Sequence, residues 1–109
     1  MVCSYAAGDY CEFSVFRPSC QPDEVVVMET AFYGRMQVGT CVRSDLGYVG
    51  CYSDVLDLLD RRCSGRRSCA VGVPDQQLAK RNSCMPELKV YLKTSYRCQK
   101  GRHIALMRL

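Results

Sequence analysis

The chain has 109 residues, nine cysteines, 48% hydrophobic residues and a net charge of +4. That length fits one small domain, and cysteine at about 8% is typical of a disulfide scaffold outside the reducing cytosol. The absence of an 18-residue apolar run and of any Cys-x2-Cys pair argues against a membrane span and a zinc site, while the modest charge disfavours nucleic acid. We expect one domain of a longer extracellular protein.

The first half of the chain predicts two strands and a loop. Residues 12–17 read as a short strand, and prolines on either side of Cys20 indicate a turn. Residues 24–32 are rich in β-branched and apolar types, which predicts a buried strand that ends at Gly34. Two glycines within residues 43–50 predict a loop.

The second half predicts two helices and two strands. A helix begins near Ser53 or Asp54, since apolar residues follow at helical spacing, and it ends at Ser64–Gly65. Residues 69–73 predict a strand, and Pro74–Asp75 opens a short helix to about Arg81. Residues 88–97 alternate as a half-buried strand does. One face holds Leu88, Val90, Leu92 and Tyr96, and the solvent face holds Lys89, Tyr91, Lys93, Ser95 and Arg97.

These elements predict an α+β fold, a small disulfide-stapled domain with antiparallel β-strands, about two helices and long structured loops. Basic residues gather around the expected helix end, where they form a candidate site for a sulfated, heparin-like glycan. They are Arg61, Arg62, Arg66, Arg67, Lys80 and Arg81. The alternative interpretation is a solvated helix end and turn.

Catalysis is disfavoured, and no cofactor is indicated. The only histidine, His103, stands near the C-terminus, and the chain has no Gly-x-Ser-x-Gly, His-Glu-x-x-His or phosphate-loop motif. No loop dense in Asp, Glu and Asn suggests calcium.

The order of several motifs resembles that of a lectin family. The chain has Cys11-Glu12 with a second cysteine at Cys20, and then the run Ala31-Phe-Tyr-Gly-Arg35. Cys63 and Cys69 form a Cys-x5-Cys pair at the end of the expected helix, and a Lys89-Val-Tyr-Leu run leads to Tyr96-x-Cys98. This pattern resembles the SUEL-type (rhamnose- or galactose-binding) lectin domain. That domain occurs in free animal lectins, latrophilin-type adhesion receptors, polycystin-like proteins and enhanced-ventral-axon-guidance receptors.

The resemblance implies a domain over residues 11–98, with an N-terminal extension over 1–10 and a C-terminal tail over 99–109. It also implies a disulfide pairing, which the sequence alone leaves open among 105 connectivities of eight cysteines. The implied pairs are Cys11–Cys41, Cys20–Cys98, Cys51–Cys84 and Cys63–Cys69. Cys3 has no counterpart in this framework.

The resemblance further implies a sugar site at Glu12, Tyr33 and Lys89, and the lack of a calcium-type loop predicts that binding is independent of calcium. A carboxylate accepts hydrogen bonds from sugar hydroxyls, an ammonium donates them, and a tyrosine ring covers an apolar sugar face. The chain departs from the family at Asn82-Ser83-Cys84, where the family has Asp-Pro-Cys. The expected function is therefore an extracellular carbohydrate-binding module, and the partner is a glycan or glycoprotein. The alternative is recognition of another cell-surface protein by a receptor module whose sugar pocket is vestigial.

Overall fold

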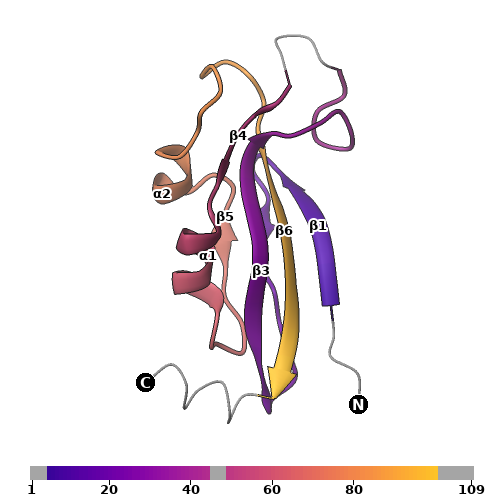
Figure 1. Cartoon of the computed structure of the whole chain (residues 1–109), viewed down its shortest axis with the longest axis vertical. Helices are drawn as coiled ribbons and strands as arrows, with labels where there is room; N and C mark the ends of the chain where they lie inside the picture. The colour runs from indigo at the N-terminus through magenta and orange to yellow at the C-terminus, as the bar shows by residue number, and fades with distance from the viewer. Residues whose placement is uncertain (1–4, 45–48, 101–109) are drawn as a thin grey trace.

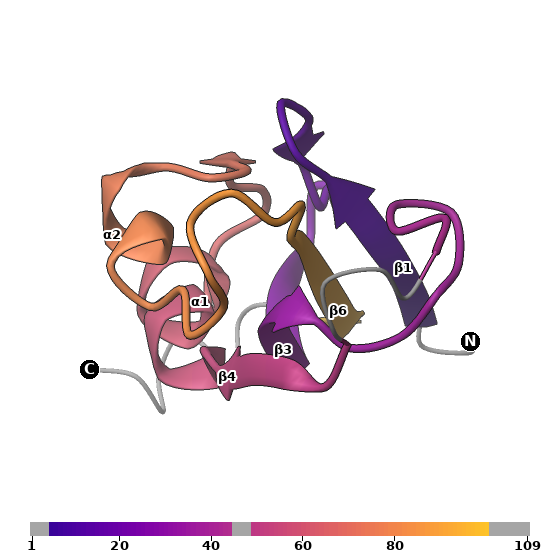
Figure 2. The same ribbon diagram turned by 90° about the horizontal axis from the view of Figure 1, so that it is seen from above.

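A four-stranded antiparallel sheet forms one layer of the domain, and both described helices lie against the same face of it (Figures 1 and 2). The computed structural model describes residues 5–44 and 49–100. The strand order in the sheet is β1, β6, β3, β4, and a small second sheet pairs β2 with β5. The elements are β1 Tyr5–Cys11, β2 Val15–Phe16, β3 Glu24–Arg35, β4 Cys51–Asp54, α1 Leu56–Cys63, β5 Val71–Gly72, α2 Gln76–Ala79 and β6 Tyr91–Lys100. The predicted α+β class with antiparallel strands, two helices and disulfides is confirmed.

The N-terminal segment departs most from the prediction. A strand was expected at residues 12–17, but there the chain makes a turn and only Val15–Phe16 is a strand. Instead, β1 runs antiparallel to β6, from Tyr5 opposite Arg97 to Cys11 opposite Tyr91. Ala, Gly and Asp in β1 have weak strand preferences, so its conformation comes from pairing with β6 rather than from local sequence. Cys3 lies outside the described residues, as do 101–109 of the expected tail.

The long strand β3 forms because its β-branched and apolar residues suit a pleated surface between two neighbours. Its predicted end at Gly34 is wrong, because the strand continues to Arg35. Gly34 has a φ of +147°, and an added Cβ would lie 2.3 Å from the Cys51 carbonyl oxygen. The glycine therefore allows β4 to approach the end of β3 closely instead of ending the strand.

The first helix begins later than predicted. Ser53 and Asp54 belong to β4, which pairs with β3, and α1 starts at Leu56. The Asp54 Oδ1 atom still accepts a hydrogen bond from the Leu56 N–H at 2.9 Å. The second helix covers only Gln76–Ala79 of the predicted 74–81, and its N-cap Asp75 accepts from the Leu78 N–H at 2.9 Å. Asp side chains thus satisfy free N–H groups at both helix starts.

The core lies between the sheet and the helical layer. Side chains from both layers interlock there, and Phe16 makes edge-to-face contacts with Tyr10 and Tyr96 at centroid distances of 4.9 and 5.9 Å. The core cluster also contains Val26, Met28, Ala31, Tyr33, Val55, Leu58, Leu59, Val71, Val73, Leu78, Val90 and Leu92. The opposite face of the sheet carries surface ion pairs such as Lys93–Asp9 and Arg97–Glu29.

The last strand, β6, spans Tyr91–Lys100 rather than the predicted 88–97, and its Leu92 faces the core. Tyr91 was predicted on the solvent face, yet it is only 1% exposed. The reason is tertiary: its hydroxyl bonds to the backbone of Gln37, so residues 36–44 fold over that face.

Four disulfides tie these elements together, and they are the pairs that the family resemblance implies. Cys20–Cys98 spans 78 residues of sequence and joins the loop before β3 to the end of β6. Cys63–Cys69 closes the turn after α1. The other two are Cys11–Cys41 and Cys51–Cys84.

Candidate functional site

A tight turn at the end of β1 places the first predicted sugar-binding residue, Glu12. The Cys11 carbonyl accepts hydrogen bonds from the N–H and Oγ of Ser14, at 3.2 and 2.5 Å. The Phe13 N–H donates to the Val73 carbonyl at 2.6 Å, and the Val73 N–H donates to Ser14 at 3.0 Å. These backbone bonds hold the turn against the segment that follows β5, so the position of Glu12 is well defined.

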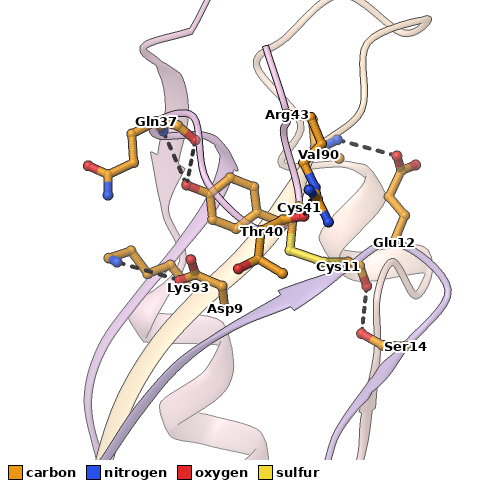
Figure 3. Close-up of a disulfide and its surroundings, with 11 residues drawn as sticks. Asp9, Cys11, Glu12, Ser14, Gln37, Thr40, Cys41, Arg43, Val90 and Lys93 are labelled. Atoms are coloured by element: carbon orange, nitrogen blue, oxygen red, sulfur yellow. Dashed lines mark hydrogen bonds and ion pairs between the residues drawn. A yellow bond between two sulfur atoms is a disulfide. The ribbon is translucent and has the colours of Figure 1, made fainter. Parts of the chain in front are cut away.

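The Cys11–Cys41 disulfide brings a second segment, residues 36–44, beside Glu12 (Figure 3). The two Gln37–Tyr91 bonds fix the start of this segment, and an Arg43 Nε bond to the Thr40 carbonyl at 3.2 Å braces its end. Thr40 and Arg43 therefore stand near the carboxylate. Sequence reasoning missed both residues. The implied Cys11–Cys41 pair was the available signal, because it places the neighbours of Cys41 next to Glu12.

The third part of the site comes just before β6. The Val90 N–H donates to Oε1 of Glu12 at 3.4 Å, and Figure 3 shows the carboxylate turned toward this backbone group. The Arg35 Nη1 atom, at the end of β3, donates to the Lys89 carbonyl at 2.8 Å. The Lys89 backbone is thereby held beside the Glu12 turn, while its side chain is exposed to solvent.

These three segments enclose a hollow of about 270 Å³, which we call the Glu12 hollow. It combines a carboxylate, two cationic side chains, a hydroxyl and an aromatic ring. The volume is a little below the roughly 300 Å³ at which drug-sized sites begin, so it suits a small ligand. Its lining residues are Cys11, Glu12, Phe13, Thr40, Cys41, Arg43, Lys89 and Val90.

Of the three predicted sugar-binding residues, Glu12 and Lys89 line the same hollow, whereas Tyr33 lies in the core at 1% exposure. Tyr33 sits in β3 between Ser53 of β4 and Leu92 of β6. Burial, and to a lesser extent the negative charges of Glu12 and Asp75, raise the pKa of its phenol to about 12. Tyr33 thus lies within electrostatic reach of the Glu12 carboxylate but does not line the hollow.

Three of the six basic residues predicted to bind sulfated glycans pair with carboxylates. Arg81 donates two hydrogen bonds to Asp57, at 3.1 and 2.9 Å, and Arg61 lies 3.7 Å from the same carboxylate. Arg62 pairs with Asp75. The hydrogen bonds from Arg81 lower the pKa of Asp57 to about 2, so this carboxylate stays charged at neutral pH. Arg67 bonds the Cys20 carbonyl at 3.2 Å, and Arg66 and Lys80 are exposed.

At Asn82-Ser83-Cys84, where the family has Asp-Pro-Cys, the Asn82 Oδ1 atom accepts a hydrogen bond from the Cys84 N–H at 2.9 Å. An amide oxygen thus serves as the side-chain acceptor in this turn.

Two negative observations apply to residues 5–44 and 49–100. These residues contain no cluster of His, Cys, Asp and Glu that could hold a metal ion. Neither helix of the described part is long and apolar enough to cross a lipid bilayer.

The comparison with protein families decides the identity of the domain. The family model of the D-galactoside/L-rhamnose binding SUEL lectin domain matches residues 18–98. The chain belongs to this family. A search of curated proteins finds no match. The matched range of the SUEL lectin domain includes Tyr33 and Lys89, and Glu12 lies six residues before it starts. The family is one of carbohydrate-binding modules, and four disulfides favour a location outside the reducing cytosol.

Proposed function

We propose that this SUEL lectin domain binds a rhamnose- or galactose-like sugar in the Glu12 hollow without a metal ion. We further propose that it belongs to a secreted protein or to the extracellular part of a cell-surface protein. The observation that carries the proposal is the convergence of Glu12, Arg43 and Lys89 on one small hollow in a member of this family.

The chemistry of these groups suits a polyhydroxyl ligand. A carboxylate offers about four acceptor positions, and the Val90 N–H takes one of those on Glu12. The remaining positions can accept from neighbouring sugar hydroxyls, while the ammonium of Lys89 and the guanidinium of Arg43 donate to sugar oxygens. Such charge-assisted bonds are roughly twice as strong as neutral ones, so no metal is needed to hold the hydroxyls.

The test is titration with L-rhamnose and D-galactose, followed by calorimetry or NMR, with and without EDTA. Glu12→Gln keeps the shape of the side chain but removes its charge, and we expect binding to weaken about 10- to 100-fold, which corresponds to about 1.5–3 kcal/mol. The matched control is Glu29→Gln, the same chemical change at a carboxylate that does not line the Glu12 hollow and that pairs with Arg97. It should bind the sugar as the wild type does.

No response of the wild type to a panel of free sugars would reject the proposal. Equal losses of sugar affinity in Glu12→Gln and Glu29→Gln would reject the location of the site at the Glu12 hollow. Loss of binding in EDTA would reject the absence of a metal.

A protein partner on the cell surface is the second candidate. The supporting observation is Tyr52, which is 51% exposed beside Phe32 on a hollow of about 270 Å³ that Met36, Gln37 and Lys93 also line. On this alternative, Tyr52→Ala abolishes capture of the partner while Glu12→Gln leaves it unchanged. If instead Glu12→Gln abolishes capture and Tyr52→Ala leaves it unchanged, the domain binds a glycan of the partner in the Glu12 hollow.

A sulfated glycan is a weaker candidate ligand than a neutral sugar, because Asp57 and Asp75 neutralise much of the charge of Arg61, Arg62 and Arg81. We expect the domain to leave a heparin column at low salt, and Arg66→Ala with Arg67→Ala to change that elution little. Retention at high salt that these two substitutions abolish would restore the sulfated-glycan alternative.

A further inference from the structure

Phe13 combines two features that are each unfavourable for a phenylalanine. Its φ is +71°, in the left-handed region that bulky side chains rarely adopt. Its side chain is also 92% exposed, the highest exposure among the large hydrophobic residues of the described chain. Backbone strain of this kind is concentrated at ligand-binding sites, where the rest of the structure maintains it.

The fold offers no reason for a phenylalanine at this position. The Ser14 N–H to Cys11 carbonyl bond closes a four-residue turn in which Phe13 is the third residue. With a positive φ, that place favours Gly or Asn. The bond from the Phe13 N–H to Val73 is made by the backbone, so other residues would make it equally well. Within the described residues, the core cluster does not include Phe13.

The location of Phe13 gives a reason for an aromatic residue at this position. Phe13 lines the Glu12 hollow together with Glu12, Arg43 and Lys89. The hollow therefore has hydrogen-bonding groups of both charges and one exposed aromatic ring. A sugar ring has matching parts, since its hydroxyls are polar at the edge while its C–H groups form an apolar face. Ligand sites typically combine apolar or aromatic surface with a few well-placed polar groups.

We propose that Phe13 is a sugar-contacting residue that determines specificity, and that its ring packs on the apolar C–H face or methyl group of the bound saccharide. This inference rests on the proposed function, because it needs a sugar held by Glu12. It predicts that the domain prefers saccharides with an unbroken C–H face or a 6-methyl group over open-chain polyols. Part of the binding free energy then comes from burying a ring that is exposed in the free protein.

The experiment compares Phe13→Gly and Phe13→Asn with the wild type. Both replacements tolerate positive φ, so the thermal midpoint should stay the same or rise. Affinity for methyl α-L-rhamnoside or methyl β-D-galactoside should fall about fivefold, the range of one aromatic contact. Phe13→Tyr should retain the affinity. Tyr5→Asn removes another exposed aromatic at the far end of β1, and it should leave binding unchanged.

The outcomes separate this inference from the proposed function. If Phe13→Gly binds as tightly as the wild type while Glu12→Gln does not, the role of Phe13 is wrong and the sugar site stands. If the wild type binds no sugar, both proposals fail. A large drop in the thermal midpoint of both Phe13→Gly and Phe13→Asn would show that the ring is structural and would overturn the inference. Weaker binding with an unchanged or higher midpoint would support it.

Discussion

Two disulfides offer a matched test of how the fold supports the site. Cys11–Cys41 and Cys51–Cys84 close loops of nearly equal length, with sequence separations of 30 and 33, and all four cysteines are partly buried. The chain-entropy model of cross-linking depends on loop length alone. It gives a loss of about 3.7 kcal/mol at 25 °C when either pair is replaced by alanines. The two double variants should therefore be destabilised equally.

Their effects on binding should differ. Cys11–Cys41 is the covalent link between the Glu12 turn and the segment that carries Thr40 and Arg43, whereas neither Cys51 nor Cys84 lines the Glu12 hollow. Without that link, residues 36–44 are held only by the Gln37–Tyr91 and Arg43–Thr40 bonds, and the ligand must order part of the segment, at a cost of about 1–2 kcal/mol per residue fixed. Ordering even one residue corresponds to an affinity loss of about tenfold.

The assay is urea unfolding of both double variants, followed by sugar titration under conditions where both are folded. We expect equal shifts in the free energy of unfolding and at least a tenfold weaker affinity for Cys11→Ala with Cys41→Ala alone. Equal affinities in the two variants would refute the idea that the disulfide organises the site. Unequal stability losses would refute the loop-length argument.

Two further predictions concern Gly34 and Tyr33, adjacent residues of β3. Gly34→Ala should destabilise the domain by about 3 kcal/mol or more, because the new methyl group would lie 2.3 Å from the Cys51 carbonyl oxygen at a φ of +147°. Urea unfolding measures this change. A loss of stability below about 1 kcal/mol would contradict the close approach of β4 to Gly34. Tyr33 has a pKa of about 12 in the folded protein against about 10 in the unfolded chain, so the unfolded chain ionises first and stability falls as pH rises from 10 toward 12, by about 2–3 kcal/mol in total. Tyr33→Phe should reduce the loss of stability between unfolding curves measured at pH 9.5 and 10.5. An unchanged loss would show that Tyr33 is not its source.

Much of the framework could be predicted because it depends on local signals. The β-branched run of β3 and the apolar face of α1 specify their elements through periods of two and 3.6 residues. The family resemblance supplied the disulfide partners, which no periodicity reveals. Glu12 and Lys89 came from the same resemblance, and the structure places them at one hollow.

The missed features all arise from tertiary contacts. The Ala, Gly and Asp residues of Tyr5–Cys11 have weak strand preferences, and pairing with β6 makes the segment a strand. Tyr91 alternates onto the outer face as predicted, yet a segment more than fifty residues earlier covers it through Gln37. Thr40 and Arg43 reach the site through a disulfide, and the positive φ of Phe13 contradicts the preference of its residue type.

Each of three bonds that hold the rim of the Glu12 hollow uses a backbone group of a rim residue. The Phe13 N–H bonds Val73, Arg35 bonds the carbonyl of Lys89, and Arg43 bonds the carbonyl of Thr40. A backbone group keeps its partner when the side chain at that position changes, so the shape of the rim should survive substitution of Phe13, Lys89 or Thr40. Stability then resides in the disulfides and the core, and ligand preference in side chains that the fold does not need. Replacing those side chains should therefore change the affinity for saccharides at little cost in the free energy of unfolding, as the Phe13→Asn and Glu12→Gln variants test directly.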